Sequence, residues 1–271
     1  MCQTRYPIFL VHGTGFRDKK PLNYWGRIPA ALQKKGATVT YGHQDAWGTV
    51  ADNAVMLRKN LIKYVDETNC GKVNIIAHSK GGLEARYLVH TLGCGYLVAS
   101  ITTVATPHHG SKTMDVIQKL PSWIMHGIAL PINGISKLLG DEKPDFFTAC
   151  AQFTTEHMKK FNANNPDVDG VYYQSYASAM KSPFNDVIML VQNIVVRLIE
   201  GDNDGLVTTV SARWTNFKEI WIGSSRRGIS HMDTVDARRR RLTRKELQNN
   251  GIADVCDCYI AIVEELKRMG F

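Results

Sequence analysis

Short apolar runs alternate along the chain with segments whose apolar residues recur every three or four positions. The runs 8–11, 73–77 and 97–105 are read as buried strands, and residues 50–65 line one face of a helix. The same alternation closes the chain, where we expect the strands 171–177 and 214–222 and the helices 187–199 and 255–269. Strands separated by helices in this way predict an α/β protein with a mostly parallel central sheet flanked by helices.

Residues 112–160 interrupt this rhythm. They are rich in apolar side chains, but the run is interrupted by Pro121, Gly127, Pro131, Gly134 and Gly140. We therefore expect short apolar helices joined by glycine hinges, inserted as a lid or cap at about 112–160. Neither an internal repeat nor a linker divides the rest, so the sequence predicts a single domain over residues 1–271.

Composition narrows the classes of protein that need consideration. Hydrophobic residues make up 44% of the chain and charged residues 21%, and no run of about 18 apolar residues occurs, so a transmembrane helix is not expected. The net charge of +8 owes much to the four arginines at 238–241. Such a run is explained by a solvated helix face or by contact with an anionic lipid surface, and no nucleic-acid-binding motif accompanies it. The six cysteines are scattered, which favours free thiols.

The start of the chain bears on its location. A strand-like run begins within seven residues of Met1, so we expect no signal peptide in this chain. We expect either a cytoplasmic protein or one exported without a signal or after its removal, with an extracellular location slightly favoured. The sequence does not predict an oligomeric state.

The segment V-N-I-I-A-H-S-K-G-G, residues 73–82, passes from a strand into a helix through Ser79. Small residues stand two positions before and two after this serine, at Ala77 and Gly81. This pattern is typical of a nucleophile elbow, in which a strained turn lifts the serine hydroxyl above the sheet. The turn also places the Lys80 backbone N–H at the positive end of a helix, where it can hydrogen-bond an oxyanion.

A serine nucleophile needs a base and an acid that orients the base. His231, in G-I-S-H-M-D after the strand 214–222, is the expected base. Asp204 and Asp202 both stand in E-G-D-N-D-G-L-V, and Asp204 is favoured because it directly precedes the residues that re-enter the core. The first strand ends in H-G-T-G, whose glycines allow close backbone approach, so the Thr14 N–H is the expected second oxyanion donor.

These motifs together resemble the bacterial triacylglycerol lipases of the Pseudomonas, Burkholderia and Proteus type over most of the chain. The likeness is carried by Y-P-I-F-L-V-H-G, N-Y-W-G-R-I-P-A-A-L, K-V-N-I-I-A-H-S-K-G-G, A-T-P-H-H-G-S-K-T-M-D, F-T-T-E-H-M-K-K-F-N, N-D-G-L-V and H-M-D-T-V-D. The resemblance implies an α/β-hydrolase fold, a triad of Ser79, Asp204 and His231, and an oxyanion hole built from the Thr14 and Lys80 N–H groups. It strengthens the choice of Asp204 over Asp202.

The resemblance also implies a structural calcium near the histidine loop, but here the sequence departs from the family. Asp233 matches one ligand and Asp186 loosely matches the other carboxylate, whereas the expected glutamine is Ala237. Calcium takes six to eight oxygen ligands. Two interpretations therefore remain open. One is a calcium ion bound by Asp186 and Asp233, and the other is a plain ion pair between Asp233 and Arg238.

The sequence predicts a serine ester hydrolase that needs no cofactor for its chemistry. An apolar lid over the serine favours a lipase that cleaves acylglycerol esters and makes transient contact with a lipid surface. The alternative is a short-chain carboxylesterase with a fixed cap, and a remote one is a non-enzymatic protein that binds an anionic surface. Nucleic acid is not an expected partner, and His108 and His109 are read as polar contacts rather than metal ligands.

Overall fold

The computed structural model of the chain describes residues 1–19, 23–223, 228–243 and 252–271. In these residues a sheet of six parallel strands has the order β2-β1-β3-β4-β5-β6. The strands are β1 (Ile8–Val11), β2 (Val39–Tyr41), β3 (Val73–His78), β4 (Val98–Val104), β5 (Tyr172–Ser178) and β6 (Phe217–Trp221). The prediction of a mostly parallel sheet is confirmed, although the last strand is shorter than the expected 214–222.

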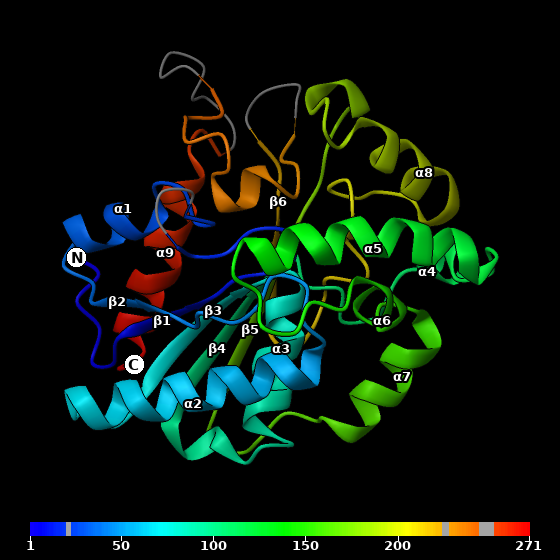
Figure 1. Ribbon diagram of the computed structural model, residues 1–271. Coiled ribbons are helices and arrows are strands. Elements are labelled where there is room, and N and C mark those ends of the chain that lie inside the picture. Colours follow the sequence, from blue (N-terminus) through cyan, green and yellow to red (C-terminus); the bar gives the residue numbers. More distant parts are fainter. Residues whose placement is uncertain (20–22, 224–227, 244–251) are drawn as a thin grey trace.

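Helices cover both faces of the sheet (Figure 1). One face packs on α1 (Ile28–Lys34) and α9 (Val255–Arg268), and the other packs on α2 (Val50–Thr68) and α3 (Lys80–Val89). Ile8 of β1 is buried against the first pair of helices and Phe9 against the second, because successive residues of a strand face opposite sides. Burial on both faces explains why the strands read as continuous apolar runs in the sequence.

The segment between β4 and β5 is largely helical. It contains α4 (Lys112–Ile117), α5 (Ser122–Leu138), α6 (Phe146–Ala151) and α7 (Thr155–Asn164). The prediction of hinges at Gly127 and Gly134 is wrong, because both glycines lie inside the continuous helix α5. A glycine weakens a helix by only about 1 kcal/mol, which is a small cost for a long helix that also packs on α6. Gly140, with a φ of +99°, instead follows the end of this helix.

After β5 the chain forms α8 (Leu190–Glu200), which packs on α4 (Figure 1). Three short 3-10 turns complete the described elements: η1 (Cys94–Leu97), η2 (Pro183–Asn185) and η3 (Asp233–Val235). All six cysteines are free thiols, as expected. Because the strands are parallel, the loops that follow β1, β3 and β6 meet at one edge of the sheet, where α/β proteins place their sites.

Candidate active site

Ser79 occupies a sharp turn between β3 and α3. Its φ of +54° and ψ of −129° lie in a region that residues other than glycine rarely adopt. Its N–H donates a 3.0 Å hydrogen bond to Val104 O at the end of β4, which holds the strained backbone in place. This is the local geometry of a nucleophile elbow.

Two glycines set how closely this turn is packed. A Cβ on Gly81 would lie 2.4 Å from the carbonyl oxygen of His12, so α3 can start this close to β1 only with glycine there. A Cβ on Gly13 would lie 2.8 Å from the Cβ of Ser79. The loop after β1, which continues into Thr14, is therefore in direct contact with the elbow.

His231 is paired with Asp204. The His231 Nδ1 lies 2.9 Å from Asp204 Oδ2, and the His231 backbone N–H donates to Asp204 O at 2.7 Å. Both side chains are buried, whereas Asp202 is exposed and pairs with Arg197 at the surface. Within the described residues, Ser79 Oγ makes no hydrogen bond to the other ring nitrogen of His231, a contact that often tightens only when substrate binds.

Three more donors fix the carboxylate of Asp204. Ser178 Oγ donates to Oδ2 at 2.9 Å, and the N–H groups of Leu206 and Val207 donate to Oδ1 at 3.1 and 2.9 Å. These bonds hold the carboxylate in one orientation toward His231. Ser178 is the last residue of β5 and stands in no motif, so the sequence carried no signal for it.

A second buried histidine connects the elbow to the His231 loop. The ring centroids of His78 and His231 are 4.5 Å apart. His78 Nδ1 lies 2.7 Å from the Tyr24 hydroxyl and Nε2 lies 2.7 Å from Thr234 Oγ1, while Thr234 donates to His231 O at 2.6 Å. Because Thr234 donates its proton to His231 O, it accepts from His78 Nε2, which assigns the neutral tautomer.

Burial, with His231 and His12 nearby, lowers the pKa of His78 well below its usual value, so this ring stays uncharged. Sequence reasoning identified neither Tyr24 nor Thr234 as part of the site. Tyr24 lies in N-Y-W-G and Thr234 in H-M-D-T, which belong to the motifs that carry the family resemblance. This placement was the available signal for a role in the site.

The two expected oxyanion donors border the same edge. A cavity of about 60 Å³ beside His231 is lined by Thr14, Phe16, Tyr24, His78, Leu206, His231, Met232, Val235 and Ala237. Lys80 is the first residue of α3, so its N–H is among the unpaired donors of a helix N-terminus. The Lys80 ammonium points elsewhere and lies 2.8 Å from Glu84 Oε1 in a fully buried ion pair. Only the backbone of Lys80 is therefore available to the site.

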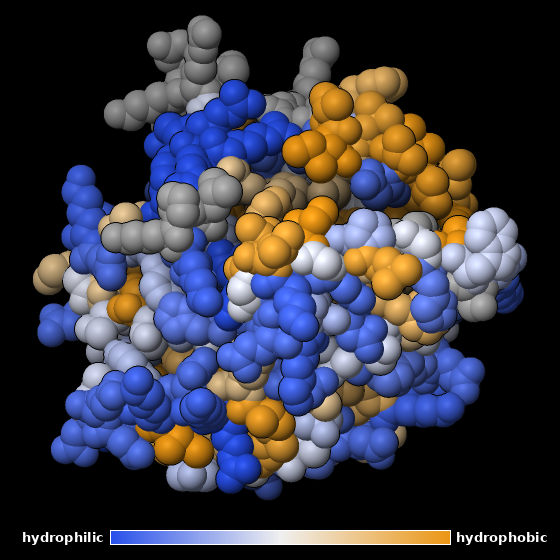
Figure 2. Space-filling model, viewed as in Figure 1, coloured by the Kyte–Doolittle hydropathy of each residue, from blue (hydrophilic) through white to orange (hydrophobic). Residues whose placement is uncertain are grey.

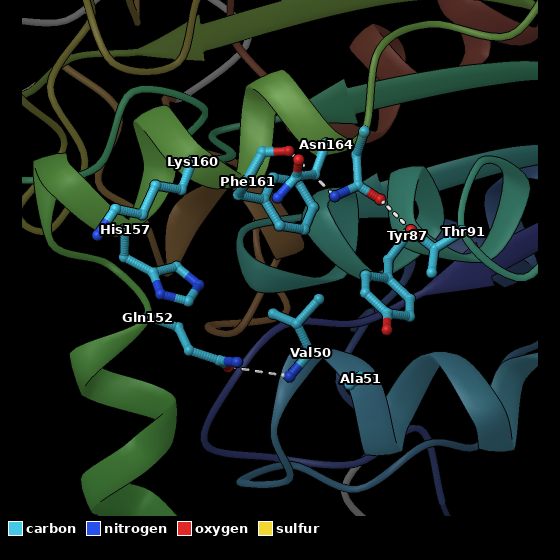
Figure 3. A pocket seen from close by; sticks show the side chains of 10 residues that line it. Val50, Ala51, Tyr87, Thr91, Gln152, His157, Lys160, Phe161 and Asn164 are labelled. Atoms are coloured by element: carbon cyan, nitrogen blue, oxygen red, sulfur yellow. Dashed lines mark hydrogen bonds between the residues drawn. The ribbon is translucent and has the colours of Figure 1, made fainter.

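A larger hollow of about 380 Å³ lies between α7, the start of α2 and the end of α3 (Figure 3). Its lining residues are Val50, Ala51, Tyr87, Thr91, Gln152, His157, Lys160, Phe161, Asn164 and Asn165. None of the predicted site residues is among them. The hollow is therefore separate from the candidate active site.

Comparison with known proteins identifies the family. No family model matches the chain. Triacylglycerol lipase 2 of Saccharomyces cerevisiae is 27% identical over 263 residues, which cover 92% of this chain and 75% of that protein. A triacylglycerol lipase of Vibrio cholerae is 30% identical over 233 residues, which cover 77% of this chain and 74% of that protein. The chain belongs to the triacylglycerol lipases.

The fold of this lipase agrees with that assignment. The Staphylococcus hyicus lipase matches 98% of the chain and 96% of its own with a TM-score of 0.72 and 19% identity. The protein therefore has the α/β-hydrolase fold. Its membership of the triacylglycerol lipases makes it an ester-hydrolysing enzyme of the lipase and esterase type. Both expectations from the sequence resemblance are confirmed.

The carboxylates expected to bind calcium do come together in this lipase, but around an arginine. Arg238 Nη2 lies 2.8 Å from Asp186 Oδ2, and Arg238 Nε lies 3.4 Å from Asp233 Oδ1. The nearby Asp236 is bound by Arg27 at 2.7 Å. Because guanidinium groups already neutralise all three carboxylates, the residues present do not fit a calcium ion.

Proposed function

We propose that this lipase cleaves carboxylic esters through an acyl-enzyme on Ser79, with His231 as the general base and Asp204 as the residue that orients it. The observation that carries this proposal is the buried His231–Asp204 pair at the sheet edge where Ser79 occupies its strained turn. A serine hydroxyl is a weak nucleophile without a base. An imidazole whose Nδ1–H is held by a carboxylate presents its Nε2 as the proton acceptor.

The reaction then runs through two tetrahedral intermediates. Ser79 Oγ attacks the ester carbonyl carbon while His231 Nε2 takes its proton, and the Thr14 and Lys80 N–H groups bind the oxyanion. His231 gives the proton to the departing alcohol, which leaves the acyl-enzyme. Water attacks next, with His231 again accepting a proton, and the acid is released as Ser79 recovers its hydrogen. Asp204 stabilises the imidazolium in both halves, and no cofactor takes part.

Acylglycerols are the proposed substrates. The relatives in yeast and Vibrio cholerae carry the name triacylglycerol lipase. Apolar side chains are exposed on α8, before it and on α5: Phe184, Val187, Ile188, Val191, Leu198, Trp123, Leu130 and Leu138. Figure 2 shows a broad hydrophobic area on this side of the molecule. An exposed apolar area of this kind suits contact with a lipid surface. No helix of the described residues is long and apolar enough to cross a membrane.

The cavity beside His231 favours a second candidate, a hydrolase of short-chain esters. Its volume of about 60 Å³ is far below the roughly 300 Å³ at which ordinary ligand pockets begin. A long acyl chain would enter only if a covering segment moved. We propose that the covering segment belongs to the expected lid at about 112–160, since movement of a lid opens many enzyme sites.

Hydrolysis of p-nitrophenyl palmitate and emulsified triolein, compared with p-nitrophenyl butyrate, tests the substrate class. We expect the wild-type protein to cleave all three, and cleavage of butyrate alone would leave the short-chain candidate. The variant Ser79→Ala should lose at least about 1000-fold in kcat and its labelling by a fluorophosphonate, with an unchanged Tm. A Ser79→Ala protein with full activity would refute the acyl-enzyme.

A further inference from the structure

Arg238 lies between two buried carboxylates from distant parts of the chain. Asp186 precedes α8, and Asp233 begins η3 in the loop that carries His231. The guanidinium contacts Asp186 through Nη2 at 2.8 Å and Asp233 through Nε at 3.4 Å. The side chains of the two acids are 2% and 5% exposed, whereas that of Arg238 is 25% exposed. One cation therefore bridges two buried anions.

Each oxygen of the two carboxylates lies within 3.4 Å of a protein N–H or O–H group. Ser230 Oγ donates to Asp186 Oδ2 at 2.6 Å, and the Ile188 N–H donates to Asp186 Oδ1 at 3.1 Å. The Ser230 N–H donates to Asp233 Oδ2 at 3.2 Å, and Arg238 Nε lies 3.4 Å from the remaining oxygen, Asp233 Oδ1. A calcium ion would have to displace the guanidinium and still find most of its six to eight oxygens elsewhere.

We infer that Arg238 serves as a built-in cation at this position, so that the lipase holds its His231 loop in place without calcium. A divalent ion and a guanidinium both relieve repulsion between two buried acids, but the arginine is covalently attached and always charged. Its planar group also donates in two directions at once. The link joins the segment before α8 to the loop on which the proposed base lies.

The first experiment uses the wild-type protein in EDTA and in millimolar CaCl2. We expect its Tm to differ by less than about 1 °C between the two, and its esterase activity to be equal. A loss of Tm or of activity in EDTA, or a clear gain of Tm in CaCl2, would overturn the inference. The Tm does not depend on the chemistry of Ser79, so failure of the proposed function would be distinguished from failure of this inference.

The second experiment removes the built-in cation with Arg238→Ala. We expect the Tm to fall by roughly 5–10 °C, because two buried carboxylates lose their partner. Millimolar CaCl2 should then recover part of the loss in Arg238→Ala, and not in the double variant Arg238→Ala/Asp233→Asn. An unchanged Tm would overturn the inference. If calcium did not recover the lost Tm, Arg238 would be part of an ordinary salt bridge. The inference that it replaces a calcium ion would then be overturned.

A matched control separates this site from ion pairs in general. Arg197 also pairs with an aspartate, Asp202, at 3.1 Å, but both side chains are exposed. Arg197→Ala should change the Tm by no more than about 2 °C and should not respond to calcium. If Arg238→Ala yields no folded protein, Arg238→Lys keeps the charge but cannot bridge both acids with a planar fork. We expect an intermediate Tm for it, and a Tm equal to that of the wild type would count against the bridge.

Discussion

The loop of residues 229–238 contacts two separate groups of buried carboxylates, and the basic side chain that lies against the carboxylates differs between them. Asp204 holds the imidazole of His231, while Asp186 and Asp233 hold the guanidinium of Arg238. An imidazole gains and loses a proton near neutral pH, whereas a guanidinium is always charged. We therefore expect the Asp204–His231 pair, the reactive pair, to take part in catalysis, and the contacts of Arg238 with Asp186 and Asp233, the fastening, to hold the loop in place.

The two sites also depend on each other. The loop contacts Asp204 through the His231 backbone N–H and contacts Asp186 through Ser230 and Arg238. The fastening therefore limits how far the imidazole can move away from its own acid. Breaking the reactive pair should remove activity with little effect on stability, and breaking the contacts around it should affect both.

The largest effect is expected for Asp204→Asn. An asparagine keeps the shape of the side chain but can hold His231 in the wrong tautomer, so kcat should fall by about 10⁴-fold. The Tm should change little, because the amide oxygen can still accept from the Leu206 and Val207 N–H groups, while the Ser178 hydroxyl can turn to accept from the amide NH2. Steady-state rates on p-nitrophenyl butyrate and a melting curve measure the two quantities.

Asp202→Asn is the matched control for that variant. Asp202 lies two residues earlier in the same motif, yet its carboxylate is exposed and pairs with Arg197. We expect its kcat to stay within about twofold of the wild type, since exposed ion pairs contribute little. If Asp202→Asn lost activity and Asp204→Asn kept it, the proposed triad would be wrong.

The sequence predicted the parts of this site that depend on local pattern. Ser79 was found because a strand, small residues and a helix start follow one another within a few positions, and the structure pairs His231 with the favoured Asp204. The parallel sheet followed from the alternation of buried strands and helices. These features need only the order of residue types along the chain.

The other features of the fold and the site depend on contacts between distant residues, which local sequence patterns do not predict. Asp186 and Arg238 are far apart in the sequence, and nothing there decided between calcium and an ion pair. The hinges expected at Gly127 and Gly134 did not form, because packing overrides the small helix penalty of a glycine. The predicted triad and oxyanion roles, the single-domain organisation with its lid, and the location of the protein stay predictions.

The next effect in size is expected for Thr234→Val. Valine keeps the volume of threonine but removes the hydroxyl that joins His78 Nε2 to His231 O, and it leaves two buried polar groups without a partner. We expect unfolding to require about 2 kcal/mol less, and kcat to fall by about tenfold because the imidazole is less well positioned.

A positioning role for Thr234 predicts more than lost stability. The pH dependence of kcat should change in Thr234→Val, since the environment of the proposed base changes. Thr68→Val is the control, because Thr68 is exposed and bonds only its own helix through Tyr64 O. Denaturant titration and pH–rate profiles of both variants test the assignment. An unchanged pH–rate profile in Thr234→Val would show that the contacts of Thr234 with His78 and His231 have only a structural role.

A smaller effect concerns pH and two buried neutral histidines. Burial lowers the pKa of His78, and burial with the nearby Arg86 lowers the pKa of His108, both well below the usual value. The unfolded chain therefore binds these protons first as the pH falls. Each ring should lower the free energy of unfolding by up to about 1.4 kcal/mol per pH unit below about pH 6.5.

The variant His78→Asn separates the two histidines. It keeps a polar side chain between Tyr24 and Thr234 but removes one titrating group from the folded protein. The slope of unfolding free energy against pH between about 5 and 6.5 should decrease by up to about 1.4 kcal/mol per pH unit. Urea titrations across this range measure the slope, and equal slopes in both proteins would contradict a neutral buried His78.

The smallest effect is expected for Arg240→Ala, two residues beyond the fastening. Arg240 is exposed, so its removal should change the free energy of unfolding by less than about 0.5 kcal/mol. If the arginine run also meets an anionic lipid surface, the variant should bind phosphatidylserine vesicles about fivefold more weakly, because one arginine near such a surface contributes about 1 kcal/mol. Sedimentation with vesicles at low and high salt measures this effect. Equal binding of wild type and variant would show that Arg240 does not contact the lipid. Arg238 would keep its assigned role, and the apolar side chains of α5 and α8 would be the expected lipid contact.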